Sequence, residues 1–186
     1  MGTEIEKKYR LNSEKRAELL LRLIEVGAVM EGEEFEENTI YGGRELDPRR
    51  SVLRLRRIRD HAILTYKERS PSSSAIKRHR EDETRVEDAG ALADILDALG
   101  FVAALVYEKR RMTWRIDDAE AVIDELPFGL FLEIEGEEKT IIEVERLLGL
   151  DEAEAEMASY PELTQRFGER RGDVIEARFQ TNLSEM

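Results

Sequence analysis

The stretch Glu4-Ile5-Glu6-Lys7-Lys8-Tyr9-Arg10-Leu11 limits how this chain can fold. In a β-strand, successive side chains point to opposite faces, so this stretch separates into an apolar row and a charged row. The apolar row is Ile5, Tyr9 and Leu11, and the charged row is Glu4, Glu6, Lys8 and Arg10. An edge strand with one face in water would show the same pattern. Several later segments repeat it, however, and 133–135 is again Glu-Ile-Glu.

Length and composition limit the class of protein. A chain of 186 residues fits one domain and can bury a substantial core. It has no cysteine, which excludes disulfides and thiolate metal sites. No apolar run is long enough to span a bilayer, and no signal peptide is recognisable, so a cytoplasmic protein is expected. The net charge of −13 repels nucleic acid and anionic lipid, so neither a nucleic acid nor a membrane is expected as a partner.

Hydrophobic periodicity predicts the order strand, helix, four strands, helix, three strands, helix. The predicted strands are 4–11, 35–41, 52–59, 62–69, 77–86, 105–116, 121–126 and 130–135. The predicted helices are 13–27, 88–100 and 138–148, with short helices at 151–157 and 160–163. Their expected inner faces are Ala17, Leu20, Leu21 and Ile24; Leu92, Ile95, Leu96 and Leu99; and Ile141, Val144 and Leu148. The pattern fades beyond Gly168, so the tail 168–186 is expected to be disordered.

Two folds are compatible with this pattern, and they differ in whether the charged rows face water or the inside of a barrel. An open sheet covered by helices on one face would leave the rows in water. Eight strands can instead close into a small barrel, and rows built from Glu-x-Glu, Arg-x-Arg and Lys-x-Arg favour a charged lumen. The lumen would then hold six basic and seven acidic residues: Glu4, Glu6, Lys8, Arg54, Arg56, Lys67, Glu81, Glu83, Lys109, Arg111, Asp124, Glu133 and Glu135.

A lumen with so many charges is expected to be wet and to bind a charged ligand, because burying each ion dry costs several kcal/mol. Paired carboxylates are hard oxygen donors that suit Mg²⁺ or Mn²⁺. Arginines at strand spacing suit bidentate binding of phosphate oxygens. Together these residue types indicate a ligand that contains both a metal ion and a polyphosphate.

Six sequence blocks in this order resemble the CYTH-domain proteins, which belong to the triphosphate tunnel metalloenzymes. The blocks are Glu4-x-Glu6-x-Lys8; Leu53-Arg54-Leu55-Arg56; Leu64-Thr65-Tyr66-Lys67; Glu81-Asp82-Glu83; Lys109-Arg110-Arg111; and Asp124 through Phe131-Leu132-Glu133-Ile134-Glu135. Tyr160 and Leu163 match the family's C-terminal Ser-Tyr-x-x-Leu segment. The resemblance covers residues 1–167 and implies an α+β fold, an eight-stranded antiparallel β-barrel with flanking helices.

The resemblance also implies a role for each lumen residue. The implied phosphate-binding residues are Lys8, Arg54, Arg56, Lys67, Lys109 and Arg111. The implied ligands of Mg²⁺ or Mn²⁺ are Glu4, Glu6, Asp124, Glu133 and Glu135, assisted by Glu81 or Glu83. The residues implied to be catalytic are Glu4, Glu6, Lys67, Glu133 and Glu135.

The expected function is metal-dependent hydrolysis of a small triphosphate, which would be inorganic tripolyphosphate, thiamine triphosphate or a nucleoside triphosphate. The alternative within the family is a class IV adenylyl cyclase, which converts ATP to cyclic AMP and pyrophosphate. The alternative that needs no catalysis is a polyphosphate-binding module. The sequence leaves the choice of substrate and a homodimer open.

Some residues outside the motifs allow two interpretations. His61 and His79 are expected to be exposed beside turns, and Trp114 is expected in the core. Arg49 and Arg50 are either solvated loop charges or a basic loop at a tunnel mouth that recruits phosphate. Arg10 and Arg115 have the alternation of lumen residues and are either further ligand-binding residues or, near the strand ends, side chains that reach solvent.

Overall fold

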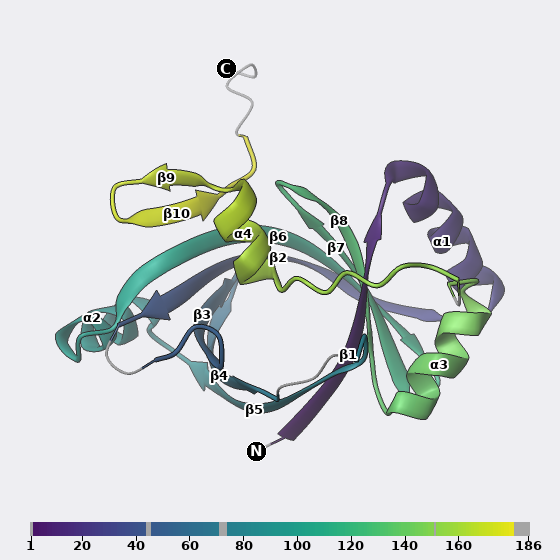
Figure 1. The fold of residues 1–186 in the computed structure, drawn as a ribbon, viewed down its shortest axis with the longest axis horizontal. Coiled ribbons are helices and arrows are strands. Elements are labelled where there is room, and N and C mark those ends of the chain that lie inside the picture. The colour runs from purple at the N-terminus through teal and green to yellow at the C-terminus, as the bar shows by residue number, and fades with distance from the viewer. Residues whose placement is uncertain (1, 44–45, 71–73, 151, 181–186) are drawn as a thin grey trace.

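Two local runs of antiparallel strands and the first strand of the chain close into a barrel in the computed structural model, which describes residues 2–43, 46–70, 74–150 and 152–180 (Figure 1). The first run is β2 (Val29–Gly42), β3 (Ser51–Ile58), β4 (His61–Arg69) and β5 (Lys77–Val86). The second run is β6 (Val102–Ile116), β7 (Ala119–Leu126) and β8 (Gly129–Glu135).

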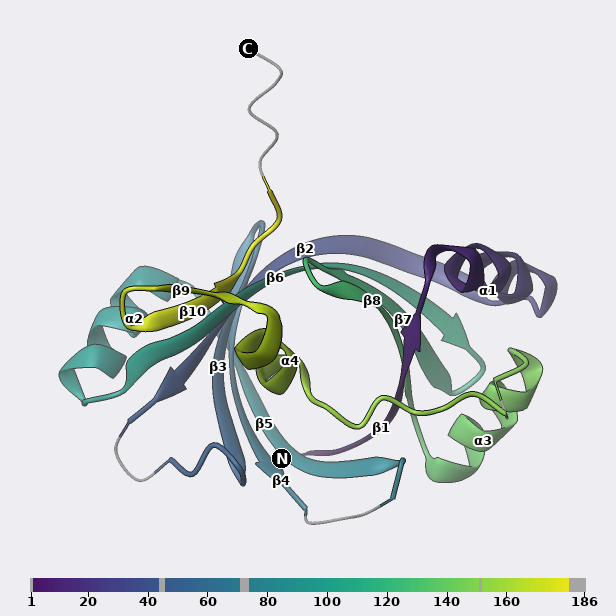
Figure 2. The same ribbon diagram turned by 45° about the horizontal axis from the view of Figure 1, so that its top comes forward.

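Strand β1 (Gly2–Leu11) joins the two runs, because it pairs with β5 on one side and with β8 on the other. Pairing of β2 with β6 closes the barrel, and Figure 2 looks into its opening. The predicted eight-stranded antiparallel barrel is therefore confirmed, and the open sheet is excluded. Strand β2 begins at Val29 rather than at residue 35, because its polar first half pairs with β6 beyond an irregularity between Met30 and Gly32.

The apolar face of β1 packs under two helices on the outside of the barrel. Tyr9 and Leu11 lie in a buried cluster with Leu23 of α1 (Ser13–Glu25) and Ile141 of α3 (Glu138–Leu147). Figure 1 shows both helices on the same side of the barrel. The predicted inner face of α3 is confirmed, because Ile141, Val144 and Leu148 are all buried. Trp114 is also buried in this cluster, as predicted.

The predicted inner faces of the other two long helices are partly wrong. In α1 the side chains of Leu19 and Leu23 are buried, whereas Leu21 and Ile24 are 64% and 63% exposed. Residues 19–21 are all leucine, so two overlapping stripes of helical period were available and only packing chose between them. In α2 (Ala89–Ala98), Leu96 is buried, but Ile95 and Leu99, at the helix end, are exposed.

The segment that follows α3 crosses the barrel end before entering α4 (Tyr160–Phe167), as Figure 2 shows. Ser159 caps α4: its hydroxyl accepts a bond from the Glu162 N–H, and the Glu162 carboxylate accepts one from the Ser159 N–H. The short helix predicted at 151–157 is wrong over 152–157, where no helix forms. Residue 151 lies outside the described residues.

The predicted disorder after Gly168 is wrong for the first part of the tail. Strands β9 (Glu169–Arg171) and β10 (Val174–Ala177) form a hairpin, and β10 pairs in parallel with β6. The Arg178 guanidinium then donates to the carboxylates of Glu37 (2.6 Å) and Glu108 (3.0 Å) on the outer face of β2 and β6. Residues 181–186 lie outside the described residues.

Within the described ranges, no helix combines the length and the apolar composition that crossing a bilayer requires.

Candidate active site in the barrel tunnel

The charged rows of the strands meet inside the barrel and line a tunnel cavity of about 80 Å³. Ten of the predicted site residues line it: Glu4, Glu6, Lys8, Arg54, Arg56, Lys67, Lys109, Arg111, Glu133 and Glu135. The other three contact this set, since Glu81 and Glu83 pair with Arg54, and Asp124 pairs with Arg111. The structure thus brings all the predicted site residues together.

Three carboxylates converge where β1 meets β8, and we call Glu4, Glu6 and Glu135 the carboxylate cluster. One carboxylate oxygen from each lies within 4.8 Å of the others. The cluster forms because Glu6 and Glu135 are directly opposite each other in the β1–β8 register. Lys67 supplies the nearest positive charge: its Nζ contacts the Glu4 carboxylate and lies 3.1 Å from Glu81 Oε2.

The carboxylate cluster has too little counter-charge to keep all its members ionised. Burial raises the pKa of Glu135 to about 8, because the repulsion from Glu133 and Glu4 adds to burial and outweighs Arg111. Burial, with Glu4 nearby, likewise raises the pKa of Glu81 to about 7 against the opposing effect of Lys67. Burial acts in the same sense on Glu6, but His79, Lys67 and Lys8 overcome it and hold the pKa of Glu6 well below its usual range.

His79 is a tunnel residue, so the predicted exposed position beside a turn is wrong. It lies in β5 on the same face as Glu81, with 8% of its surface exposed. Its Nε2 is 3.8 Å from Glu6 Oε1, and its Nδ1 is buried without a hydrogen-bond partner in the described part of the chain. The sequence signal for this position was strand alternation, which places His79 on the same face as Glu81 and Glu83. His61, by comparison, is half-buried at the start of β4.

A second group of charges, deeper in the barrel, is internally balanced, and we call Glu36, Lys109, Arg111 and Asp124 the paired network. Arg111 donates two bonds to Asp124, at 2.8 and 2.7 Å, and a third to Glu133 at 2.8 Å. Lys109 Nζ lies 3.2 Å from Glu36 and 3.4 Å from Asp124. The Tyr160 hydroxyl of α4 donates to Asp124 at 2.8 Å.

In the paired network the pKa values of the acids are lowered, whereas those of Glu135 and Glu81 are raised. Burial alone would raise the pKa of Asp124, but Arg111 and Lys109 outweigh it and lower that pKa. Lys109 and Arg56 lower the pKa of the fully buried Glu36 in the same way. Both acids are therefore held ionised by fixed cations. Asp124 lies here and not in the carboxylate cluster, although the sequence placed it among the metal ligands.

Sequence reasoning missed several polar residues in or beside the tunnel, among them Glu36, Asn38 and Tyr160. Glu36 and Asn38 of β2 are fully buried, and the Asn38 amide donates to Glu36 at 3.1 Å while its oxygen accepts from Arg56. Both faces of β2 are polar here, so alternation alone did not identify the inner one. The hydroxyl of Tyr160 was also missed, and its ring covers Lys8 Nζ at 3.9 Å.

Arg10 and Arg115 lie on the exterior, which decides between the two interpretations that the sequence allowed. The Arg10 guanidinium pairs with Glu156 and stacks on Phe131 outside the tunnel. Arg115 pairs with Glu31 at 2.6 Å near the end of β6. Both side chains are about half exposed, so they are surface ion pairs and not part of the lumen.

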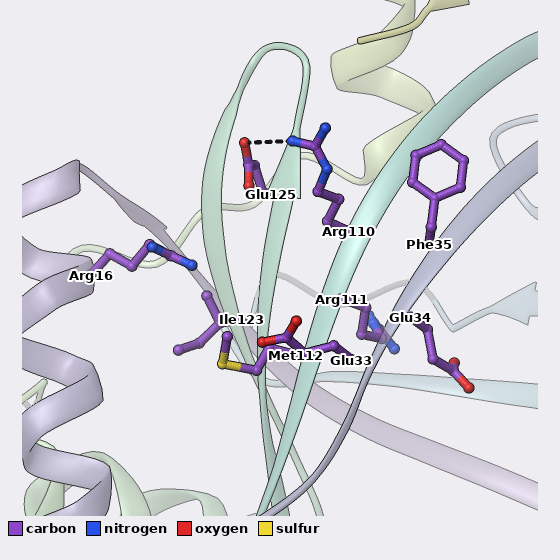
Figure 3. Close-up of a pocket in the computed structure, with 9 residues that line it drawn as sticks. All are labelled: Arg16, Glu33, Glu34, Phe35, Arg110, Arg111, Met112, Ile123 and Glu125. Carbon is purple, nitrogen blue, oxygen red and sulfur yellow. Dashed lines mark hydrogen bonds and ion pairs between the residues drawn. The ribbon is translucent and has the colours of Figure 1, made fainter.

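A larger hollow of about 330 Å³ lies outside the barrel, between α1 and the outer faces of β2, β6 and β7 (Figure 3). Its wall combines Phe35, Met112 and Ile123 with the ion pair of Arg110 and Glu125, whose atoms are 3.2 Å apart. Arg111 contributes to this wall from β6 while its guanidinium binds Asp124 in the tunnel. Glu33 and Glu34 also line this hollow, but among the described residues the carboxylates close enough to share a metal ion are Glu4, Glu6 and Glu135 of the tunnel.

The CYTH domain family model matches residues 2–167, and the chain belongs to that family. A protein of Methanocaldococcus jannaschii named "putative adenylate cyclase" is 29% identical over 149 residues, which are 78% of this chain and 83% of that protein.

Solved structures agree with the fold. The PH1012 protein of Pyrococcus horikoshii superposes with a TM-score of 0.75 at 29% identity, over 86% of this chain and 98% of that one. A Hippeastrum protein, described as a "putative adenylyl cyclase" with a dominant triphosphatase activity, superposes with a TM-score of 0.64 at 19% identity. That match covers 88% of this chain and 95% of the other, and it shows the shared fold alone.

The carboxylate cluster fits a divalent cation in both chemistry and charge. It offers three hard oxygen donors within 4.8 Å, the kind of ligand that Mg²⁺ and Mn²⁺ prefer. The pKa of Glu135 is raised by burial and by the repulsion from Glu133, Glu4 and Glu6, which Arg111 at 4.0 Å does not offset. A bound cation would supply the missing counter-charge.

Proposed function

We propose that this protein is a divalent-metal-dependent phosphohydrolase that cleaves a triphosphate inside the barrel tunnel. The observation that carries the proposal is the position of the carboxylate cluster beside enclosed basic rows. Carboxylates that lack counter-charge suit a metal ion, and arginines and lysines held in a tunnel suit phosphate oxygens. Membership of the CYTH domain family supports the same conclusion.

In this proposal the basic rows bind and orient the substrate. The phosphate oxygens are bound by Lys8, Lys67, Arg54, Arg56, Lys109 and Arg111. Arg111 is pre-positioned for this because Asp124 and Glu133 hold three of its hydrogen bonds. Positioning of this kind lowers the barrier to phosphoryl transfer because little reorganisation remains to be done.

In this proposal Mg²⁺ or Mn²⁺ would be held by Glu4, Glu6 and Glu135. The assisting carboxylates would be Glu81 and Glu83, which contact Arg54, and Glu133, which contacts Lys8. When bound, the ion would neutralise phosphate charge and polarise the phosphorus that is attacked. Lys67 bridges the two sets of residues, since its Nζ contacts Glu4 and Glu81. It is therefore placed to hold a phosphate oxygen next to the ion.

The test is product analysis by phosphorus NMR with tripolyphosphate, thiamine triphosphate and ATP, each with Mg²⁺ or Mn²⁺. Hydrolysis predicts orthophosphate and the corresponding diphosphate. If no substrate is consumed while tripolyphosphate still binds, the protein is a polyphosphate-binding module and the proposal is wrong.

A class IV adenylyl cyclase is the second candidate, and the name of the Methanocaldococcus jannaschii relative favours it. The same lumen residues would serve both reactions, because the 3′-hydroxyl of ATP would replace water as the nucleophile. Cyclic AMP and pyrophosphate as the products from ATP would identify the cyclase. ADP and orthophosphate would identify the hydrolase.

A further inference from the structure

A second cavity, of about 260 Å³, adjoins the tunnel, and we call it the basic vestibule. Glu6, Arg69, His79 and Ser159 line both the vestibule and the tunnel, so the two spaces are contiguous. Arg49, Arg50 and Lys77 line the vestibule only. It therefore extends the tunnel next to the carboxylate cluster, at the ends of β4 and β5.

The vestibule has an excess of positive charge. Its basic side chains are Arg49, Arg50, Arg69 and Lys77, and its acidic side chains are Glu6 and Glu162. Both acids already have partners: Glu162 accepts bonds from the Ser159 N–H and from Arg69, and Glu6 faces His79. Arg49 and Arg50 are exposed, and no other described residue pairs with their guanidinium groups.

A buried polar atom at the junction of the two spaces also lacks a partner. His79 Nδ1 has no hydrogen-bond partner in the described ranges, although nine-tenths of the side chain is buried. A buried ring nitrogen left unpaired costs free energy, so its presence indicates that a ligand or water pairs with it. The fixed cations around it make an anion the favoured ligand.

The lining also indicates what the anion is not. Among the described side chains that line the vestibule there is no Phe, Tyr or Trp, and the His79 ring is buried against Glu6, so the vestibule offers no open ring on which to stack a nucleobase or a thiazolium cation. Its positive charge would repel a cationic group attached to the triphosphate. A further phosphoryl group, in contrast, would meet two arginines that lack partners.

We propose that the basic vestibule binds the fourth and later phosphoryl groups of a linear inorganic polyphosphate. The proposal rests on the proposed function, because the first three phosphoryl groups are taken to occupy the tunnel. It adds a preference of this chain for longer phosphate chains over triphosphates that end in an organic group.

The test compares the Kd of tripolyphosphate and tetrapolyphosphate by calorimetry at low salt in excess chelator, where metal-dependent turnover is suppressed. The double variant Arg49→Ala/Arg50→Ala removes the two unpaired arginines. The matched control is Arg170→Ala/Arg171→Ala, an exposed adjacent pair in β9 that removes the same formal charge outside the vestibule. In the wild type and the control, tetrapolyphosphate should bind about tenfold more tightly than tripolyphosphate, a difference of about 1.4 kcal/mol.

In Arg49→Ala/Arg50→Ala the ratio of the two Kd values should fall to about one. Equal Kd values in the wild type, an unchanged ratio in this variant, or an equal loss in the control would overturn the vestibule proposal. These outcomes are distinct from failure of the proposed function. If tripolyphosphate binds and is hydrolysed with metal but chain length has no effect, only the vestibule proposal fails. If tripolyphosphate neither binds nor reacts, both fail.

Discussion

The carboxylate cluster and the paired network are neighbours built from the same residue types, yet their charges are balanced in opposite ways. In the β1–β8 register, Glu6 lies opposite Glu135, whereas in the β6–β7 register Arg111 lies opposite Asp124. The first pair places like charges together, and the second pairs opposite charges 2.7 Å apart. In the paired network the barrel supplies its own counter-ions, whereas in the carboxylate cluster it leaves counter-charge to be supplied by a ligand.

The largest expected effect is loss of activity from the carboxylate cluster. Glu135→Gln keeps the size of the side chain but removes a metal-binding charge, and metal assistance amounts to several kcal/mol. Turnover of tripolyphosphate with Mg²⁺ should fall by about 10³-fold. Thermal unfolding should change little, because the cluster is crowded with like charge. The matched control is Glu125→Gln on the outer face, where the partner of Glu125 among the described residues is the exposed Arg110. Near-normal turnover of Glu135→Gln would disprove the metal assignment.

The second expected effect is on stability, and it comes from the paired network. Asp124→Asn removes the anion that pairs with the buried Arg111 and Lys109. An uncompensated buried charge is costly, so the free energy of unfolding should fall by about 3 kcal/mol. Urea unfolding of Asp124→Asn beside Glu135→Gln would measure the difference. Should Asp124→Asn lose activity but no stability, Asp124 is a metal ligand and the two groups are not as distinct as we infer.

The third effect is pH dependence of the metal-free protein. The pKa values of Glu81 and Glu135 are raised to about 7 and 8, from 4.5. Between pH 4.5 and 8 the folded state therefore binds more protons than the unfolded state, so stability falls as pH rises through this window. From pH 6 to pH 9 in chelator, the loss should be about 2 kcal/mol after allowance for solvent screening.

Unfolding midpoints measured across this pH range would test the prediction. Adding Mg²⁺ should reduce the slope, because the ion replaces the bound protons as counter-charge. Glu135→Gln should also flatten the curve, since only the Glu81 contribution remains. An identical slope in the wild type and in Glu135→Gln would show that the cluster does not hold the proton.

The smallest expected effect comes from Tyr160, which connects α4 to the paired network. Tyr160→Phe removes the buried bond to Asp124 but keeps the ring over Lys8. A net loss of about 1 kcal/mol is expected, because Asp124 keeps its bonds to Arg111. Denaturant unfolding measures this, and KM for tripolyphosphate should change less than in Arg56→Ala. A loss as large as that of Asp124→Asn would mean that Tyr160, and not Arg111, fixes the carboxylate.

The barrel and the residues of its lumen could be predicted because charged side chains recur at every second position of the strands. That alternation places them on one face of each strand. The Arg-x-Arg, Lys-x-Arg and Glu-x-Glu rows fixed which side chains face inward without any knowledge of the strand partners. Which charges neutralise which could not be predicted, because pairing depends on register between strands far apart in sequence. Asp124 opposite Arg111 is an example.

Several of the errors share one physical cause, since they arose where local sequence allowed two arrangements. The run Leu19 to Leu21 allows two apolar stripes in α1, and β2 is polar on both faces around Glu36. The β9–β10 hairpin is short and weakly apolar, and β10 pairs with β6, about 70 residues earlier in the chain. In each case tertiary contacts chose the arrangement.

The pairing of β1 has a consequence for how the protein folds as it is made. Strand β1 is synthesised first, but its partners β5 and β8 follow about 75 and 130 residues later. At translation rates of 5–20 residues per second, β1 waits on the order of ten seconds for β8. The β3–β4 and β6–β7 hairpins can form locally while β1 is still unpaired. The charged row that later lines the tunnel keeps the waiting strand hydrated, so residues that serve the mature site also protect the nascent chain from premature association.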